Sequence, residues 1–74
     1  MLLIDAKLNT NLVVKKIQGE EADKLRLMEL GLNVGTNILV KHKNILKNNL
    51  LLNFNNSCFV IGADIAKYIE VNYA

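Results

Sequence analysis

The side chains with the strongest chemistry of their own are one histidine and one cysteine, His42 and Cys58. They stand 16 residues apart and fall in different predicted strands, so the fold could bring them together as two metal ligands. A closed zinc site takes about four ligands, however, and two do not complete one. We therefore interpret His42 as a residue at the rim of the fold and Cys58 as a small buried hydrophobic residue. We predict no metal site and no cofactor.

No other set of residues has a pattern typical of an active site. No serine or cysteine stands beside a base at the spacing of an activated nucleophile. Gly31 and Gly35 follow the predicted helix instead of preceding it, and they lack the Gly-Lys-Ser/Thr context of a phosphate-binding loop. The cluster of Glu20, Glu21 and Asp23 is explained by the positive end of the helix dipole. We predict that the protein is not an enzyme.

The charges do not indicate a nucleic-acid partner. The chain has nine basic and seven acidic residues, for a net charge of +2. Lys41, Lys43 and Lys47 form a local basic patch, but no aromatic residue is interleaved with it as a platform for bases. We interpret these lysines as solvated residues that discourage pairing at a strand edge.

Length and composition indicate one small cytoplasmic domain. The chain has 74 residues, enough for a single domain over residues 1–74. Its single cysteine excludes an internal disulfide and fits a reducing compartment. No apolar stretch approaches the ~18 residues that cross a bilayer, and Asp5 interrupts the N-terminal apolar segment, which is not a secretory signal. We expect a cytoplasmic protein that does not insert into a membrane.

One helix is predicted, beginning at the acidic residues near Glu20 and continuing through strong helix formers to Leu30. Gly31 stands where a helix closes with a residue of positive φ, and Leu32 is placed for the apolar contact that accompanies such a cap. Gly35 then turns the chain into the next apolar run. We assign both glycines to backbone turns.

The rest of the chain predicts short strands. Their connections are too short for parallel crossovers, so the sheet is antiparallel, and a sheet of this size hides its edges best by closing. The predicted fold is mainly β with one α-helix, a small SH3-like antiparallel β-barrel. A single helical turn is expected over Gly62–Ala66. The predicted strands are Leu12–Ile17, Asn37–Lys43, Leu50–Phe54, Cys58–Ile61 and Tyr68–Tyr73.

The predicted core follows from this arrangement. Alternation along the second strand places Ile38 and Val40 on one face together with His42, and Lys41 and Lys43 on the other. The segment between Asn44 and Asn49 has no clear pattern. The residues assigned to the core are Leu27, Leu30, Ile38, Val40, Leu52, Val60, Ile69 and Val71.

The helix carries two apolar stripes, whereas a short surface helix normally carries one. Leu27 and Leu30 point in one direction, and Leu25 and Met28 point well away from them. Either the neighbouring loops cover both stripes or one stripe is exposed for a partner. The first alternative is favoured because the apolar segment Leu3–Leu8 needs a surface to pack on.

The second alternative is the functional hypothesis that the residues themselves provide. Arg26 and Glu29 lie three residues apart between the two stripes and can form an ion pair. An exposed apolar stripe also makes self-association plausible. The predicted partner-binding residues are Leu25, Arg26, Met28 and Glu29.

The central run also resembles a family signature. Residues 26–36, Arg-Leu-Met-Glu-Leu-Gly-Leu-Asn-Val-Gly-Thr, are similar to the Arg-Leu-x-Glu-Leu-Gly-Leu-x-Pro-Gly-Thr pattern of the FeoA family of bacterial ferrous-iron uptake. Ala66, Ile69 and Val71 fit the closing Ala-x-x-Ile-x-Val pattern of that family. Val34 stands where the family usually has proline. The resemblance covers essentially the whole chain.

This resemblance implies an SH3-like barrel and a non-enzymatic accessory protein. Its partner would be FeoB, the membrane transporter with a cytoplasmic G-protein domain, which it would bind and regulate. The same domain type also occurs fused to iron-dependent repressors. Two other hypotheses stay open: a transition-metal-binding module that delivers or senses iron, and a general protein-interaction module.

Overall fold

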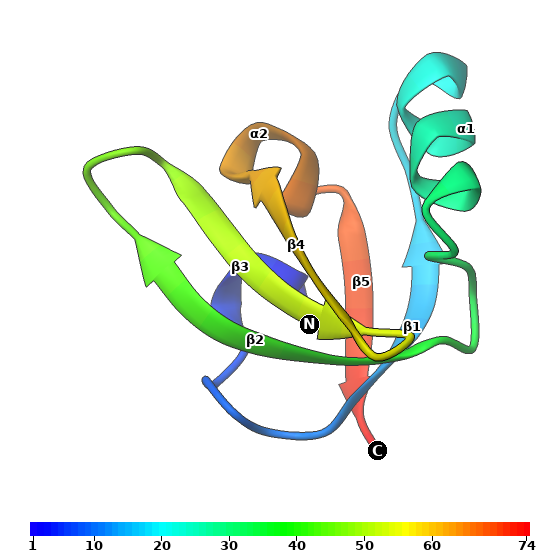
Figure 1. The fold of residues 1–74 in the computed structure, drawn as a ribbon. Helices are drawn as coiled ribbons and strands as arrows, with labels where there is room; N and C mark the ends of the chain where they lie inside the picture. Colours follow the sequence, from blue (N-terminus) through cyan, green and yellow to red (C-terminus); the bar gives the residue numbers. More distant parts are fainter.

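One antiparallel sheet of five strands forms the body of the computed structural model, which describes residues 1–74 (Figure 1). The strand order is β4-β3-β2-β1-β5. Two helices, α1 (Glu21–Glu29) and α2 (Ala63–Ala66), and one 3-10 turn, η1 (Leu3–Asp5), accompany the sheet. The strands are β1 (Leu12–Ile17), β2 (Asn37–Asn44), β3 (Asn49–Phe54), β4 (Ser57–Gly62) and β5 (Ile69–Tyr73).

The predicted fold class is confirmed, but the predicted closure of the barrel is wrong. All strand pairs are antiparallel, and the single helix and the later helical turn are both present. The outer strands β4 and β5 do not pair, so the sheet stays open. Helix α2 connects these two strands, and it packs on β3, β4 and η1, while η1 packs on β5. Helical segments therefore occupy the seam where a closing strand pair would lie.

The sheet bends where β1 and β2 meet. These strands pair over only two positions, Leu12 with Ile38 and Val13 with Asn37. In Figure 1, strands β2, β3 and β4 cross in front of β1 and β5 as a second layer. The two layers enclose the core between them.

A bulge in β2 changes which side chains face the core. Val40 and His42 pair with Leu52 and Leu51, which are consecutive residues, so Lys41 has no partner in the ladder. Because the extra residue exchanges the two faces of the strand, His42 lies on the outer face and is exposed. The predicted alternation, which put His42 on the same face as Val40, is wrong for this reason.

Two asparagines form the tight turn between β3 and β4. Asn55 and Asn56 have φ angles of +53° and +60°, and they connect the paired residues Phe54 and Ser57. Positive φ at both central positions is the geometry of a type I′ turn, whose twist matches that of the flanking strands. Strands β3 and β4 therefore form a hairpin with a two-residue loop.

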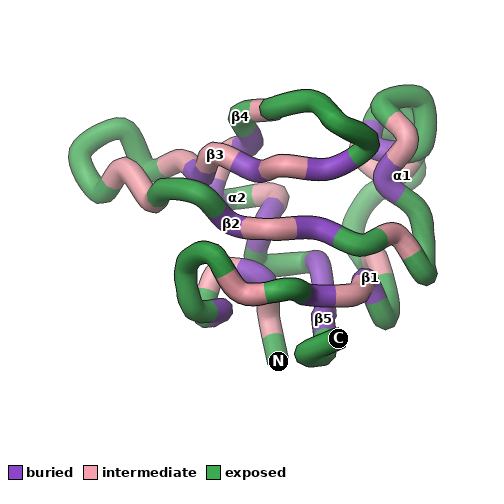
Figure 2. The backbone as a smooth tube through the Cα atoms, turned by 60° about the horizontal axis from the view of Figure 1, so that its bottom comes forward, coloured by how far each residue is buried: buried purple, intermediate pink, exposed green.

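The core consists of 16 buried residues, all hydrophobic. Six of the eight predicted core residues belong to it, but Leu30 and Val60 are 37% and 63% exposed. Val60 alternates along β4 with Phe59 and Ile61, which point inward, and Leu30 lies at the C-cap of α1. In Figure 2, buried positions alternate with less buried ones along β2 and β3. The confirmed residues are Leu27, Ile38, Val40, Leu52, Ile69 and Val71.

The end of α1 has the predicted geometry. Gly31 has a φ of +95°, its N–H donates to the Met28 carbonyl at 2.9 Å, and the Leu32 N–H donates to the Leu27 carbonyl at 2.9 Å. This pair of bonds is a Schellman motif, and the Leu32 side chain is fully buried beneath it. Gly35 also has positive φ, +93°, in the next turn. Both glycines therefore serve the backbone turns to which the sequence assigns them.

The two glycines predict different costs of substitution. We expect Gly31→Val to lower the free energy of unfolding by about 2 kcal/mol or more, because a side chain there has an unfavourable φ and meets the Asn55 amide. Gly35→Val has the same φ cost, but no atom lies within 4 Å of its added Cβ, so its loss is smaller. Thermal melts of the two variants test this order. A Gly31→Val protein that melts like the parent would contradict the assigned cap.

The attachment of α1 gives a second prediction. We expect Leu27→Ala to destabilise the domain by about 3 kcal/mol, because it empties the one buried position of the helix. Leu30→Ala is the matched control and costs less than about 1 kcal/mol, because Leu30 is partly exposed. Urea unfolding followed by circular dichroism measures both. Equal losses would show that Leu30 belongs to the core after all.

Candidate partner-binding surface

Helix α1 is attached to the domain by a narrow contact. Leu27 is the only buried residue among its nine. The N-terminal segment does not cover the helix, because η1 packs against α2 and β5 instead. The favoured prediction, that neighbouring loops cover both apolar stripes, is therefore wrong. One stripe of α1 faces outward.

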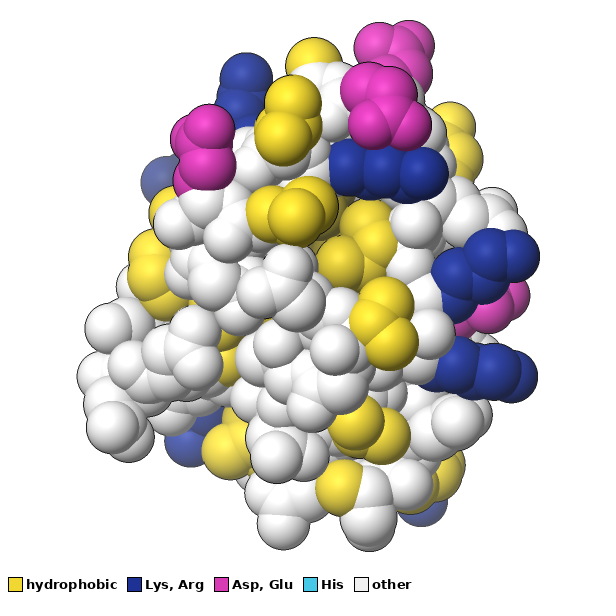
Figure 3. Space-filling view, turned by 90° about the vertical axis from the view of Figure 1, so that its right-hand side faces the viewer, with side chains coloured by type: hydrophobic (Ala, Val, Ile, Leu, Met, Phe, Trp, Pro, Cys, Tyr) yellow, Lys and Arg dark blue, Asp and Glu magenta, His cyan; other side chains and the backbone are white.

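The exposed stripe consists of Leu25 and Met28, each 55% exposed. Met28 also lines a hollow of about 290 Å³ together with Ile17 and Val34. Val34 is exposed as well, so the apolar surface continues from the helix onto the loop that follows it. Figure 3 shows hydrophobic side chains running down this side of the molecule. We call Leu25, Met28, Val34 and Ile17 the α1 surface.

Charged residues surround the α1 surface. In Figure 3, acidic and basic side chains border the hydrophobic ones. Lys24 Nζ lies 3.9 Å from Glu21 Oε1, which is the one ion pair of the structure. Arg26 and Glu29 are both exposed and do not form the ion pair that their spacing allows. An apolar centre with a charged, solvated rim is the usual composition of a protein interface.

Sequence reasoning identified the helical part of this surface and missed the rest. Leu25, Arg26, Met28 and Glu29 all lie exposed on α1, as their spacing predicts. Val34 and Ile17 join Met28 only through the fold. The sequence did contain one sign of the wider surface. Val34 is an apolar residue in the turn between Gly31 and Gly35, where a polar residue or proline is favoured.

The two soft metal ligands do not form a site. His42 lies on β2 and Cys58 on β4, and β3 runs between these strands. Neighbouring strands lie about 4.8 Å apart, so the backbones of β2 and β4 are about 10 Å apart. No group of three or more histidine, cysteine, aspartate or glutamate side chains is close enough to hold a metal ion.

Cys58 also differs from its predicted environment. It is exposed, and its Sγ lies 2.9 Å from Asn53 Oδ1, to which the thiol donates. The predicted burial is wrong, because β4 is an edge strand and Cys58 lies on the outer face with its β3 partner Asn53. The apolar run around Cys58 gives no alternation from which this face can be read.

The model of one protein family matches residues 1–73, nearly the full length of the chain, and is described as the FeoA domain. The chain belongs to the FeoA family. This confirms the resemblance in residues 26–36, and at the level of the family it supports a role in ferrous iron transport. No curated protein matches the chain.

Solved structures share the fold. The FeoA protein of Chlorobium tepidum is 27% identical with a TM-score of 0.90, and the match covers 99% of this chain and 70% of that one. The iron(II) transport protein A of Clostridium thermocellum is 18% identical with a TM-score of 0.91, over 100% and 46% of the two chains. The apo form of the manganese-activated repressor ScaR is 19% identical with a TM-score of 0.90, over 100% and 35%.

These matches agree with the sheet and helix described above. The chain spans less than half of the second and third matched proteins, so their whole-protein activities do not transfer with the fold. No helix has both the length and the apolar character to span a bilayer.

The exposed position of Cys58 can be tested in solution. We expect the thiol to react with an aromatic disulfide reagent in the folded protein at a rate within about ten-fold of that in denaturant, because Cys58 is exposed to solvent. Absorbance of the released thiolate measures the rate. A thiol that reacts only after the protein is unfolded would show that Cys58 is buried, as the sequence predicts.

Proposed function

We propose that this protein is a non-enzymatic cytoplasmic accessory of ferrous iron uptake. In this proposal it binds the cytoplasmic region of the FeoB transporter through the α1 surface and regulates transport. Membership of the FeoA family supports the role in ferrous iron uptake. The observation that carries the surface is the 55% exposure of both Leu25 and Met28 on a helix with one buried residue.

The exposed side chains contribute little to the stability of the free domain. Burying a leucine or methionine side chain fully is worth about 1.5–3 kcal/mol, and Leu25 and Met28 leave more than half of that unused. A partner that covers both side chains gains this free energy on binding. Apolar side chains at the centre of an interface typically supply most of its affinity.

The rim charges would orient the partner. Arg26 and Glu29 have no internal ion pair, so either can pair with an opposite charge across the interface without breaking a native contact. Exposed rim charges act mainly on the rate of association and on specificity. Arg26 is therefore expected to affect how fast the complex forms more than how slowly it separates.

The Schellman closure attaches the C-terminal end of α1, which carries Met28, to the sheet. Leu27 and Leu32 hold the C-terminal end of α1 on the sheet, and the Gly35 N–H donates to the Val14 carbonyl at 2.8 Å. Met28 and Val34 therefore keep a fixed spacing across the hollow between them. A preformed surface loses less conformational entropy on binding.

Binding to the purified cytoplasmic domain of FeoB tests the proposal. We expect Met28→Asp to weaken binding about 30-fold or more, because it places a charge at the apolar centre. Arg26→Glu should mainly slow association, and the effect should shrink at high salt. Surface plasmon resonance separates the two rates.

The matched control is Leu46→Asp, which puts the same charge on an exposed apolar side chain at the far end of the β2–β3 hairpin. It should bind like the parent. A folded Met28→Asp variant that also binds like the parent would contradict the α1 surface. A parent protein that does not bind a folded, active FeoB domain would contradict the proposed partner.

A further inference from the structure

The tip of the β2–β3 hairpin carries the most exposed apolar side chains of the molecule. Ile45 is 90% exposed and Leu46 is 98% exposed, within the loop that joins the paired residues Asn44 and Asn49. The Lys47 N–H donates to Asn44 Oδ1 at 3.1 Å, so the loop has a defined turn. Two adjacent aliphatic side chains are therefore held in water by an ordered loop.

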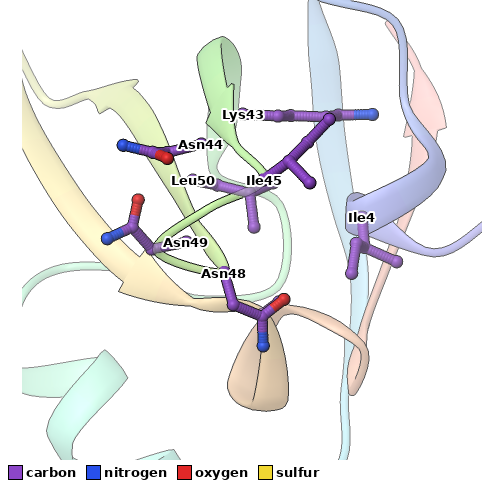
Figure 4. A pocket seen from close by; sticks show the side chains of 8 residues that line it. Ile4, Lys43, Asn44, Ile45, Asn48, Asn49 and Leu50 are labelled. Carbon is purple, nitrogen blue, oxygen red and sulfur yellow. The ribbon is translucent and has the colours of Figure 1, made fainter.

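The loop at the tip of the hairpin is also bonded to the rest of the domain. The Ala63 N–H donates to the Asn48 carbonyl at 2.9 Å, which ties the loop to the start of α2. Figure 4 shows a hollow below the tip, about 160 Å³ in volume, lined by Ile45, Leu50 and Ile4. The apolar surface therefore continues behind the tip onto η1.

The charged residues of the hairpin itself are all lysines, whereas Asp5 and Asp64 directly follow the hollow-lining residues Ile4 and Ala63. Residues 30–63 contain Lys41, Lys43 and Lys47 and no acidic residue. The remaining residues carry six basic and seven acidic side chains, a net charge of −1. Lys43 of β2 also lines the hollow (Figure 4). The positive charge of the protein is thus concentrated on the element that carries the exposed aliphatic pair.

The hairpin points away from α1. Its tip and α1 lie on opposite sides of the molecule in Figure 1, and the turned view of Figure 2 shows the same separation. A contact at the tip therefore leaves the α1 surface open.

We propose that the hairpin tip docks on an anionic lipid surface. Ile45 and Leu46 enter the headgroup region, and Lys41, Lys43 and Lys47 contact the lipid phosphates. Aliphatic side chains beside lysines are the composition that binds such interfaces, by apolar burial together with electrostatic attraction. The proposed contact is superficial, since no helix of the protein is long and apolar enough to cross a bilayer. This contact is independent of the proposed binding to FeoB.

Intrinsic fluorescence gives a direct reporter, because the chain has no tryptophan. The Leu46→Trp variant is mixed with vesicles of phosphatidylcholine and 30% phosphatidylglycerol, and its emission should shift to shorter wavelength as the indole leaves water. The matched control, Val34→Trp, carries the reporter on the α1 surface at the other end of the molecule and should not shift. A shift in Val34→Trp without one in Leu46→Trp would overturn the proposed orientation.

Co-sedimentation of the otherwise unmodified protein with the same vesicles measures affinity. Each lysine at an anionic surface strengthens binding about five-fold, so Lys41→Gln, Lys43→Gln and Lys47→Gln together should weaken it about 100-fold. The matched triple variant, Lys15→Gln, Lys16→Gln and Lys67→Gln, has the same net charge and should lose far less. Ile45→Asn with Leu46→Asn should weaken binding at least about 10-fold.

Three results would overturn the proposal. These are no binding to anionic vesicles at low salt, equal losses in the two triple variants, and unchanged binding by the Ile45→Asn, Leu46→Asn variant. If the parent ignores vesicles while that variant loses binding to the soluble FeoB domain, the tip is a protein contact instead. Binding of the parent protein to the FeoB domain is measured without lipid. A failure to bind FeoB can therefore be distinguished from a failure to bind vesicles.

Discussion

The closure of α1 at Gly31 determines which side chains of the helix enter the core and which stay exposed. The positive φ of Gly31 reverses the chain, so that the Leu32 N–H reaches the Leu27 carbonyl and both of these leucines enter the core. The following turn is fixed to β1, because the Val14 N–H donates to the Thr36 carbonyl at 3.0 Å. The helix is thus held at its C-terminal end. Its other large apolar side chains, Leu25 and Met28, stay more than half exposed, and they form the surface that the proposed partner would cover.

Local signals were sufficient for most of the fold. Turn-forming residues separate the β-branched and apolar runs, and four asparagines, Asn9, Asn48, Asn55 and Asn56, adopt positive φ in the structure. The strand boundaries therefore agree with the sequence within one residue at each end. Closure of the sheet was not predictable in this way. It depends on whether α2 and η1 fill the seam between β4 and β5, which is a matter of tertiary packing.

The errors at single residues have the same origin. The bulge at Lys41 reverses the alternation of β2, and nothing in the local residue types marks it. Val60 and Cys58 lie in an uninterrupted apolar run, which does not show which residues face the core. The helical spacing did predict that Leu25 and Met28 point away from the buried Leu27. A period of 3.6 residues fixes the relative directions of side chains on a helix. Whether anything covers them is decided by segments distant in the sequence.

The two exposed apolar sites make physical sense together. The domain buries 16 of its 74 residues and leaves several large aliphatic side chains exposed. Contiguous exposed aliphatic side chains lower solubility, and they often mark an interaction site. Two groups of them are contiguous: Leu25, Met28 and Val34 lie among charges of both signs, and Ile45 and Leu46 lie on a hairpin whose charged residues are lysines. Leu8 and Val60 are exposed elsewhere. A protein partner with its own mixed charges suits the first site, and a surface of uniform negative charge suits the second. If the hairpin tip binds the membrane in which the transporter is embedded, the whole domain stays within one domain diameter of that membrane. The α1 surface is then held at the depth of the transporter's cytoplasmic region. Confinement of this kind raises effective concentration, so two weak contacts at opposite ends can give stable association that neither gives alone.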